Sequence, residues 1–455
     1  MEKNQLIELT IKDQSKDGRG IGSCDGLIVF VDGCVLGDRV SARVTKLKKR
    51  YALAKVEEIL ELSKHRTEDV CPYIDECGGC AFGKLKYEKQ LELKERHVRD
   101  VLERIGGVEA PELEPIISME IPYNYRNKAR LAICHKTRSV GFLERLSHKV
   151  VDCRECRLQS EAVVAVADAL RASFDDCEDA KKIKNLVVKT SFSSGEVMVV
   201  PTVEEKALDL ENLIYVVDES INTIPSFDDG FEYYLSSVAL DIADNNPSKR
   251  HKNRAEIIAG RHVIEDEMLG LRFEISPYSF YQVNPMQAER LYEKAVEYAG
   301  IKGRETVLDL YCGVGTIGLF MAKAGAGKVI GIELVKEAVL NANRNAVING
   351  IVNAIYYTGK AEEELPRLRE EGEIEKADVV ILDPPRKGCD EALLKAVVET
   401  EADRIVYISC DPATMSRDVK YLVENGYEYV KGTPVDMFPH TGHVECIALI
   451  QRVKS

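Results

Sequence analysis

A cysteine near the C-terminus is placed where covalent chemistry could occur. Cys410 follows a short apolar run, Ile405–Ile408, and precedes Pro412, which has no backbone N–H to donate to a strand ladder. We therefore expect Cys410 where a strand leaves its sheet, and in open α/β sheets ligands bind at that edge. From its position alone the cysteine is either a buried packing thiol or a nucleophile.

The segment MFPHTGHVECIALI offers a base that could work with such a thiol. Glu445 begins an apolar run that predicts a closing strand, and burial there would raise the pKa of its carboxylate toward neutral pH. His440 and His443 are rival bases, and composition alone does not separate the three residues.

A glycine turn flanked by acids predicts a nucleotide-type site. A buried strand, Thr306–Leu310, contains Asp309 and leads into the turn Gly313–Gly315. The next predicted strand, Lys328–Glu333, ends on an acid that could bind both ribose hydroxyls. The turn lacks the third glycine of a pyrophosphate fingerprint, which favours S-adenosylmethionine over NAD and resembles the class I methyltransferases.

A further acid, Asp383, ends the next buried run, ADVVILDPPRKGCD, and the two prolines after it would hold the backbone rigidly beside a donor methyl. Methylases of exocyclic amines usually place an aromatic residue after such a pair, whereas this chain has Arg386. Carbon 5 of uracil is a different acceptor, and it is a poor nucleophile until a thiolate adds to carbon 6. A base must later remove the carbon-5 proton, so Cys410 and Glu445 fit the two roles.

Three predicted domains position these residues in a chain of 455 residues. Residues 1–60 alternate short apolar runs with glycines, which is typical of a small OB-like β-barrel. Residues 68–268 predict an α+β central domain with an amphipathic helix that stops at Gly106–Gly107. Residues 269–455 alternate α and β elements and predict an α/β domain with a Rossmann-like sheet.

Charge and hydropathy narrow the functional classes. The net charge is −14, yet basic residues gather in Arg39–Lys55 and Arg126–Arg154, which suits local nucleic-acid recognition or a plain solvated surface. Within the second stretch Arg126, Lys128 and Arg130 alternate, so they are expected on one strand face. No stretch approaches 18 apolar residues and the first residues lack a signal-peptide core, so we expect a cytoplasmic protein without a membrane span.

Thirteen cysteines in such a chain are expected to be reduced, so clusters among them indicate metal ligands or catalytic groups. The clustered cysteines are Cys71, Cys77, Cys80, Cys153 and Cys156. Two Cys-x2-Cys pairs would make a zinc site and leave Cys71 without a role. Three close cysteines plus a distant one are instead typical of an iron–sulfur site.

Six motifs resemble, in the same order, those of the RNA 5-methyluridine methyltransferase family, and the likeness covers nearly the whole chain. They are SFYQVNPMQAERLY, LDLYCGVGTIGL, GIELVKEAV, LDPPRKG, ISCDPATMSRD and MFPHTGHVE. The N-terminal barrel is similar to the TRAM domain, which is attached to several RNA-modifying enzymes. The branch that looks most similar methylates uracil in 23S ribosomal RNA and has a TRAM domain and a four-cysteine cluster.

The resemblance implies roles for individual residues. Cys410 would be the nucleophile and Glu445 the base. S-adenosylmethionine would be held by Gln282, Tyr311, Glu333 and Asp383. A [4Fe–4S] cluster would be held by Cys71, Cys77, Cys80 and Cys156, with zinc as the weaker alternative and Cys153 left spare.

Some positions depart from the family pattern or have a structural interpretation. Lys360 stands where relatives often have an acid, which puts an adenine contact there in doubt. Asn284 is interpreted as holding its loop, and Cys312 and Cys389 as packing thiols.

RNA is the expected partner. A paired uracil hides carbons 5 and 6, so the enzyme must act on a loop or flip the base. Phe280 and Phe438 are candidates for lining the pocket of the target base, and the row of cations is a candidate for holding the RNA backbone.

Other functions stay open at this point. One is a tRNA uracil-5-methyltransferase acting on the T-loop. Another is an RNA cytosine-5-methylase, which would usually have a cysteine in the Asp383 motif, where this chain has none. A third, of a different class, is a non-catalytic RNA-binding scaffold, which would not need Cys410, Glu445, Glu333 and Asp383 together. We expect a monomer.

Overall fold

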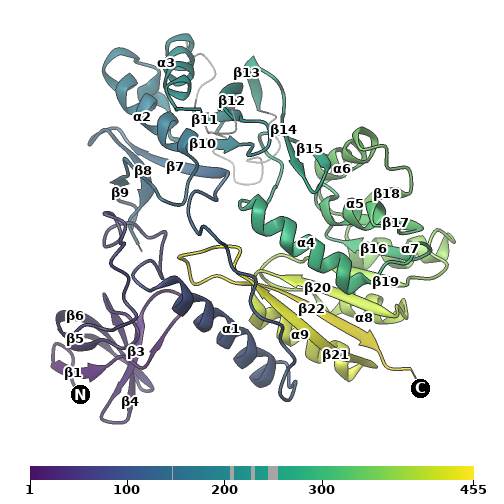
Figure 1. Cartoon of the computed structure of the whole chain (residues 1–455), viewed down its shortest axis with the longest axis horizontal. Helices are drawn as coiled ribbons and strands as arrows, with labels where there is room; N and C mark the ends of the chain where they lie inside the picture. Colours follow the sequence, from purple (N-terminus) through teal and green to yellow (C-terminus); the bar gives the residue numbers. More distant parts are fainter. Residues whose placement is uncertain (146, 205–209, 227–230, 244–254, 455) are drawn as a thin grey trace.

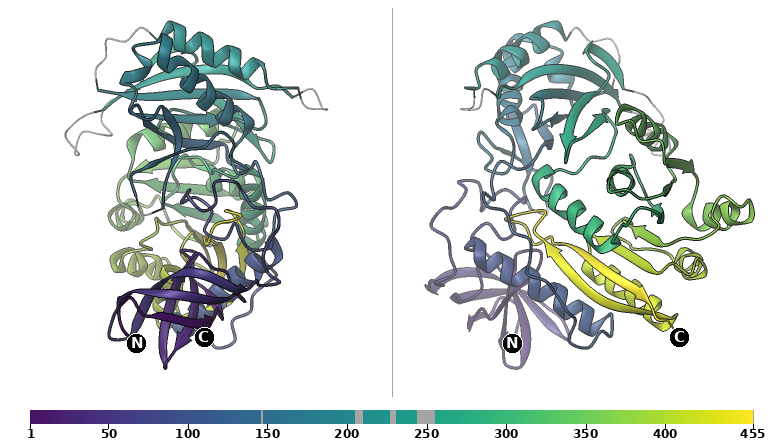
Figure 2. Two further views of the ribbon diagram at one scale, coloured as in Figure 1. Left: turned by 90° about the vertical axis from the view of Figure 1, so that its left-hand side faces the viewer. Right: turned by 45° about the vertical axis from the view of Figure 1, so that its right-hand side comes forward.

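Three main sheets follow one another along the chain (Figure 1). The computed structural model describes residues 1–145, 147–204, 210–226, 231–243 and 255–454. The N-terminal strands lie beside helix α1 (Tyr87–Arg104) (Figures 1 and 2), and α1 lies against the C-terminal domain, which we call the catalytic domain because it contains the predicted catalytic residues.

The N-terminal domain is a six-stranded sheet with the order β1-β5-β6-β4-β3-β2. β1 also contacts β3, which brings distant parts of the sheet together as in a barrel. Alternating apolar residues such as Val29, Val31 and Val40 point into its core. The strands are β1 (Leu6–Thr10), β2 (Asp13–Gln14), β3 (Gly20–Cys24), β4 (Leu27–Asp32), β5 (Arg39–Leu47) and β6 (Tyr51–Glu61).

The central domain is a seven-stranded sheet with the order β13-β12-β11-β10-β7-β8-β9. Helices α2 (Glu161–Asp176) and α3 (Glu211–Asn222) cover one face of it, with a 3-10 turn at Ala180–Lys182. The other face meets the catalytic domain through Met198 and Val200. Its strands are β7 (Lys128–Cys134), β8 (Ser139–Leu143), β9 (Val150–Asp152), β10 (Asn185–Thr190), β11 (Glu196–Val203), β12 (Tyr234–Ile242) and β13 (Glu256–Gly260).

The catalytic domain has a seven-stranded sheet with the order β18-β17-β16-β19-β20-β22-β21. β16 to β20 are parallel, and the last two strands return antiparallel. Its strands are β16 (Thr306–Leu310), β17 (Lys328–Glu333), β18 (Ala354–Thr358), β19 (Val379–Leu382), β20 (Arg404–Ser409), β21 (Tyr427–Val435) and β22 (Glu445–Arg452). Its helices are α4 (Pro285–Ala299), α5 (Thr316–Lys323), α6 (Lys336–Ile348), α7 (Ala361–Glu370), α8 (Glu391–Glu399) and α9 (Pro412–Glu424).

Two elements from the predicted central domain pack with the catalytic domain. Helix α1 (Tyr87–Arg104) buries Val98 and Leu102 in the catalytic core and lies against α9 and β21 (Figure 1). The hairpin β14 (Ile264–Met268) and β15 (Leu271–Ile275) spans the expected boundary at residue 269 and packs in the core on the other face of the catalytic sheet. We therefore propose a boundary before Ile264, with α1 as part of the catalytic unit.

The N-terminal domain touches the catalytic domain directly. A Cβ atom at Gly442 would lie 1.9 Å from the carbonyl oxygen of Lys16, so only glycine fits there. Lys16 also places its Nζ 3.6 Å from a carboxylate oxygen of Asp411. The loop between β2 and β3 thus lies beside the loops that follow β20 and precede β22. Among the described residues, no helix is both long and apolar enough to cross a bilayer.

Candidate active site

The carboxyl ends of the parallel strands bring the predicted site residues to one edge of the sheet. Asp309, Glu333 and Asp383 lie at or just after the ends of β16, β17 and β19, and Cys410 follows β20 directly. The sheet order reverses between β16 and β19, and ligands bind at such a switch point. Cys410 lies where β20 leaves the sheet, as the sequence predicted.

Sheet register places Glu445 beside Cys410. Ser409 of β20 pairs with Cys446 of antiparallel β22, so the next position on each strand brings Cys410 opposite Glu445. Directly opposed residues in antiparallel strands have Cβ atoms about 4.5–5.5 Å apart. The Cys410 thiol and the Glu445 carboxylate therefore lie side by side on two neighbouring strands at the ligand-binding edge of the sheet.

The turn after β16 is tight and helps to hold the carboxylate of Glu333. Gly313 and Gly315 have φ of 55° and 81°, and Tyr311 has φ of 66°, so this loop follows an uncommon left-handed path. The Gly313 N–H donates to Oε2 of Glu333 over 3.2 Å, and the Val335 N–H donates to Oε1 over 2.8 Å. The loop thus holds the Glu333 carboxylate at the rim, where it could also accept ribose hydroxyls.

Three carboxyl groups in this cleft have raised pKa values. Burial, with repulsion from Asp383 and Glu333, raises the pKa of Asp309 to about 7 although the Gly318 N–H donates to its Oδ2. Its Oδ1 is buried without a hydrogen-bond partner. Burial raises the pKa of Asp383 to about 7, and burial with repulsion from Asp383 raises that of Glu445 to about 8. Because a nearby cation favours the charged form of a carboxyl group, these three groups suit a cationic ligand such as a sulfonium.

Gln282 is linked to this edge of the sheet by Tyr292, a residue that sequence reasoning missed. Its side chain is hydrogen-bonded to the hydroxyl of Tyr292, a buried residue of α4 that also lies near Asp383 and Glu445. The Gln282 carbonyl accepts a 2.9 Å bond from Asn127 of the central domain. No motif marks Tyr292, because on an amphipathic helix it looks like any core aromatic residue.

The Cys410 thiol is half-buried and protonated in the free protein at neutral pH. Burial, with repulsion from Glu445 and Asp383, raises its pKa to about 11, although the Arg386 guanidinium acts in the opposite direction. Asp411 caps α9 by accepting from the Ala413 N–H, which fixes the chain just after the thiol. The cysteine therefore needs a base, or an added positive charge, to become a thiolate.

The two rival bases lie in other surroundings. His440 is buried, exchanges hydrogen bonds with Gln90 and stacks on Tyr123 with ring centroids 4.8 Å apart. Burial lowers its pKa to about 4. His443 packs edge-on against Phe438, and its pKa is lowered by burial and by nearby cations. This geometry favours Glu445 as the base near Cys410.

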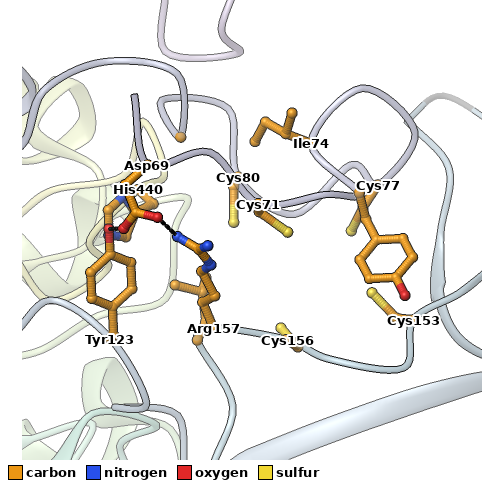
Figure 3. A pocket seen from close by; sticks show the side chains of 13 residues that line it. Asp69, Cys71, Ile74, Cys77, Cys80, Tyr123, Cys153, Cys156, Arg157 and His440 are labelled. Atoms are coloured by element: carbon orange, nitrogen blue, oxygen red, sulfur yellow. Dashed lines mark hydrogen bonds and ion pairs between the residues drawn. The ribbon is translucent and has the colours of Figure 1, made fainter. Parts of the chain in front are cut away.

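The five clustered cysteines line a single cavity of about 40 Å³ (Figure 3). They come from two segments, 71–80 and 153–156. Asp69, Tyr123, Arg157 and His440 complete its wall. Cys153 is hydrogen-bonded to Cys77, which lowers the pKa of Cys77, whereas burial raises the pKa values of Cys71, Cys80 and Cys156.

The described part of the structure does not show the iron–sulfur cluster that the resemblance implies for these thiols. Among the described residues, no group of three or more His, Cys, Asp or Glu side chains is arranged to hold a metal ion. A structural zinc site draws four ligands onto one atom, whereas a cubane spreads its thiolates over four irons. All thirteen cysteines are free, as predicted for a reduced chain.

The remaining sequence predictions meet different outcomes. Asn284 caps α4 and donates to the Met437 carbonyl, so it holds a loop as expected. Cys312 and Cys389 are buried, in keeping with packing roles. Lys360 pairs with Glu363 at the surface. Phe280 is 65% exposed.

Comparisons with known proteins agree with this architecture. A profile of the family described as tRNA (uracil-5-)-methyltransferase matches residues 86–453, and a TRAM domain profile matches residues 2–56. An uncharacterised RNA methyltransferase of Caldanaerobacter subterraneus subsp. tengcongensis is 41% identical over 99% of this chain and 98% of its own length. One from Halalkalibacterium halodurans is 36% identical over the same shares.

A solved structure resembles the whole chain. The Pyrococcus abyssi tRNA (uracil-54, C5)-methyltransferase, in complex with S-adenosyl-L-homocysteine, has a TM-score of 0.73 and 27% identity. The similarity covers 98% of this chain and 100% of the other. The chain therefore belongs to the TRAM-containing RNA (uracil-5-)-methyltransferase family.

Proposed function

We propose that this enzyme methylates carbon 5 of a specific uridine in 23S ribosomal RNA. The observation that carries the chemistry is the register of β20 and β22, which sets Cys410 opposite Glu445 at the ligand-binding edge of the sheet. RNA as the partner rests on the family and on the TRAM domain.

The chain's own residues supply nucleophile and base. The Cys410 thiol loses its proton to solvent and its sulfur adds to carbon 6 of uracil, which turns the ring into an enolate that is nucleophilic at carbon 5. S-adenosylmethionine supplies the methyl group, and Gln282, Tyr311, Glu333 and Asp383 are the residues we assign to binding it. Glu445 then takes the carbon-5 proton, and the bond from sulfur to carbon 6 breaks as the double bond re-forms. A Glu445 pKa of about 8 suits this transfer.

The cysteine cavity is assigned to a [4Fe–4S] cluster held by Cys71, Cys77, Cys80 and Cys156. Five thiols lie among the residues that line it, and thiolates are the ligands that iron–sulfur clusters use. The cluster would join segment 71–80 to Cys156, and methyl transfer needs no redox step from it.

A tRNA substrate is the second candidate, and one observation favours it. The Pyrococcus abyssi enzyme with a tRNA (uracil-54) name is similar over the full length of both chains. The presence of an N-terminal barrel therefore does not by itself separate ribosomal from transfer RNA.

RNA containing 5-fluorouridine tests both the chemistry and the substrate. Fluorine cannot leave as a proton, so the methylated adduct should stay bound to the enzyme through denaturation. We expect an adduct with 23S fragments that is absent in Cys410→Ala and retained in Cys389→Ala, a buried thiol outside the site. An adduct with tRNA alone would overturn the ribosomal assignment, and none with either RNA would overturn the role of Cys410.

A further inference from the structure

Two lysines of the central sheet face each other with no acidic partner. Lys128 of β7 and Lys189 of β10 are directly paired in the antiparallel register, so their side chains leave the same face. Like charges directly opposite each other destabilise a sheet. Within the described parts of the chain, neither lysine forms an ion pair, although the protein as a whole has a net charge of −14.

Lys189 is the more unusual of the two because its side chain is only 4% exposed. Its ammonium donates to the carbonyl oxygens of Ser276 and Ser279 over 2.7 and 2.9 Å, and both acceptors are neutral. Burial lowers its pKa well below the ordinary lysine value, and the charge of Lys128 lowers it further. Burial and the charge of Arg130 also lower the pKa of Lys128.

A structural role explains only part of this arrangement. Binding two carbonyls accounts for Lys189, because it fixes the segment that leads to Gln282. It does not account for Lys128 on the opposing position, where an apolar or acidic residue would remove the repulsion. A cation pair of this kind is explained when an anion from outside the chain lies between the two ammonium groups.

The size of the pocket between Lys128 and Lys189 limits which anion can bind there. The lysines line a small pocket with Asn127, Thr190, Ile275, Ser279 and Tyr281, none of which is acidic. Its volume is about 10 Å³, close to the smallest space that holds one water molecule. One oxygen of a phosphate fits this space, whereas a base or a ribose does not.

The pocket lies close to the proposed cofactor cleft. Its lining residues come from β7, β10, the end of β15 and the segment after β15, where the central sheet meets the catalytic domain. Asn127, in its wall, donates to the Gln282 carbonyl, and exposed Phe280 follows Ser279 directly. Arg130, two residues along β7, extends the positive charge at the surface.

We infer that Lys128 and Lys189 bind a phosphate group of the RNA backbone close to the methylated uridine. This inference rests on the proposed function, because it takes the substrate to be RNA. It gives the central sheet a part in placing the target nucleotide, separate from the N-terminal barrel.

RNA binding measured across a salt series tests the site. The variant to use is Lys128→Met, because Lys128 has no carbonyl partner whose loss would disturb the fold. We expect about tenfold weaker binding of a 23S ribosomal RNA fragment at low salt, and a slope of log affinity against log salt smaller by about one. Lys128→Arg should keep most of the affinity.

Two controls separate this site from general effects. Lys181→Met removes a surface lysine that pairs with Glu178, and it should leave both affinity and slope unchanged. Binding of S-adenosylmethionine by calorimetry should be equal in wild type and Lys128→Met. Lys189→Met should reduce the slope in the same way and not further when combined with Lys128→Met, because both contact one phosphate.

The outcomes distinguish this inference from the proposed function. If the wild-type enzyme methylates RNA but Lys128→Met keeps its affinity and salt slope, the phosphate site is wrong and the function stands. If wild type neither binds nor methylates ribosomal or transfer RNA, both are wrong.

Discussion

The loop from Asp436 to Val444 and the cysteine cavity share a wall at His440, yet they are built in opposite ways (Figure 3). In the loop, almost every polar group has a partner within the chain. In the cavity, five thiols from two distant segments face a common space, and burial raises the pKa values of Cys71, Cys80 and Cys156.

Helix α1 and its neighbours hold the loop. Lys94 and Asp436 form an ion pair with exposed fractions of 1% and 0%, and Tyr87 donates to the same carboxylate over 2.8 Å. Lys94 also donates to the Phe438 carbonyl, and Tyr125 donates to the Pro439 carbonyl, both over 3.0 Å. The loop that leads to Glu445 is therefore fixed by the chain itself, whereas the cavity brings thiols together without, among the described residues, joining its two segments through a buried ion pair of this kind.

The largest expected effect is at the end of the fixed loop. Glu445→Gln removes the proposed base, and we expect turnover to fall about 10²–10⁴-fold. The covalent RNA adduct should accumulate with ordinary uridine, because solvent can take the thiol proton whereas removal of the carbon-5 proton needs Glu445. A variant that turns over normally would assign proton removal to another group.

Glu445 should also make the stability of the folded protein depend on pH. Its pKa is raised from an ordinary 4.5 to about 8 in the folded protein. The folded state therefore keeps a proton that the unfolded chain loses, and stability falls as pH rises from about 4.5 to about 8. Chemical denaturation should show this fall as smaller in Glu445→Gln than in wild type. Equal pH slopes would mean that Glu445 titrates normally.

Breaking the ion pair under the loop comes next. Lys94→Met leaves the Asp436 carboxylate buried without its cation, which should cost about 3–5 kcal/mol of stability and lower the methylation rate. Replacing both residues, by Lys94→Met with Asp436→Leu, should restore much of the stability but not the loop's position. Lys89→Met on the same helix removes an exposed pair with Glu92 and should cost about 0–1 kcal/mol.

Substitutions in the cysteine cavity should change the methylation activity least. They should instead change the amount of iron and sulfide bound to the protein. Cys80→Ser removes a proposed ligand, so bound iron and acid-labile sulfide per chain should fall strongly after anaerobic reconstitution. Cys153→Ser should keep both, because Cys153 is the spare thiol. Zinc in the purified protein, or equal iron loss in the two variants, would overturn the ligand set.

The sequence predicted the catalytic sheet well for a physical reason. Strands buried on both faces are continuous apolar runs, and the acids at their ends mark the edge where ligands bind. Thr306–Leu310 and Lys328–Glu333 are strands with the expected bounds. Cys410 at a strand exit followed from Pro412.

What covers an apolar face cannot be predicted from its own residues. The pattern of α1 shows that the helix has a buried side, but its partners, α9 and β21, lie more than 300 residues away. The pairing of Lys94 with Asp436 and the placing of Tyr292 depend on the same tertiary contacts. The spacing of the cysteines predicted a shared site, but it did not predict that all five would line one cavity, because each proposed ligand set left one cysteine out.

The contacts of the loop also bear on when the enzyme becomes active during synthesis. Lys94 and Asp436 are 342 positions apart, and Lys16 meets Gly442 across nearly the whole chain. Domains generally fold in order as the chain emerges, and contacts this distant form late. Until the last segment is made, α1 has its apolar side uncovered and Lys94 has no counter-charge. Only a completed chain can then carry a working site, and a truncated product would have no active form.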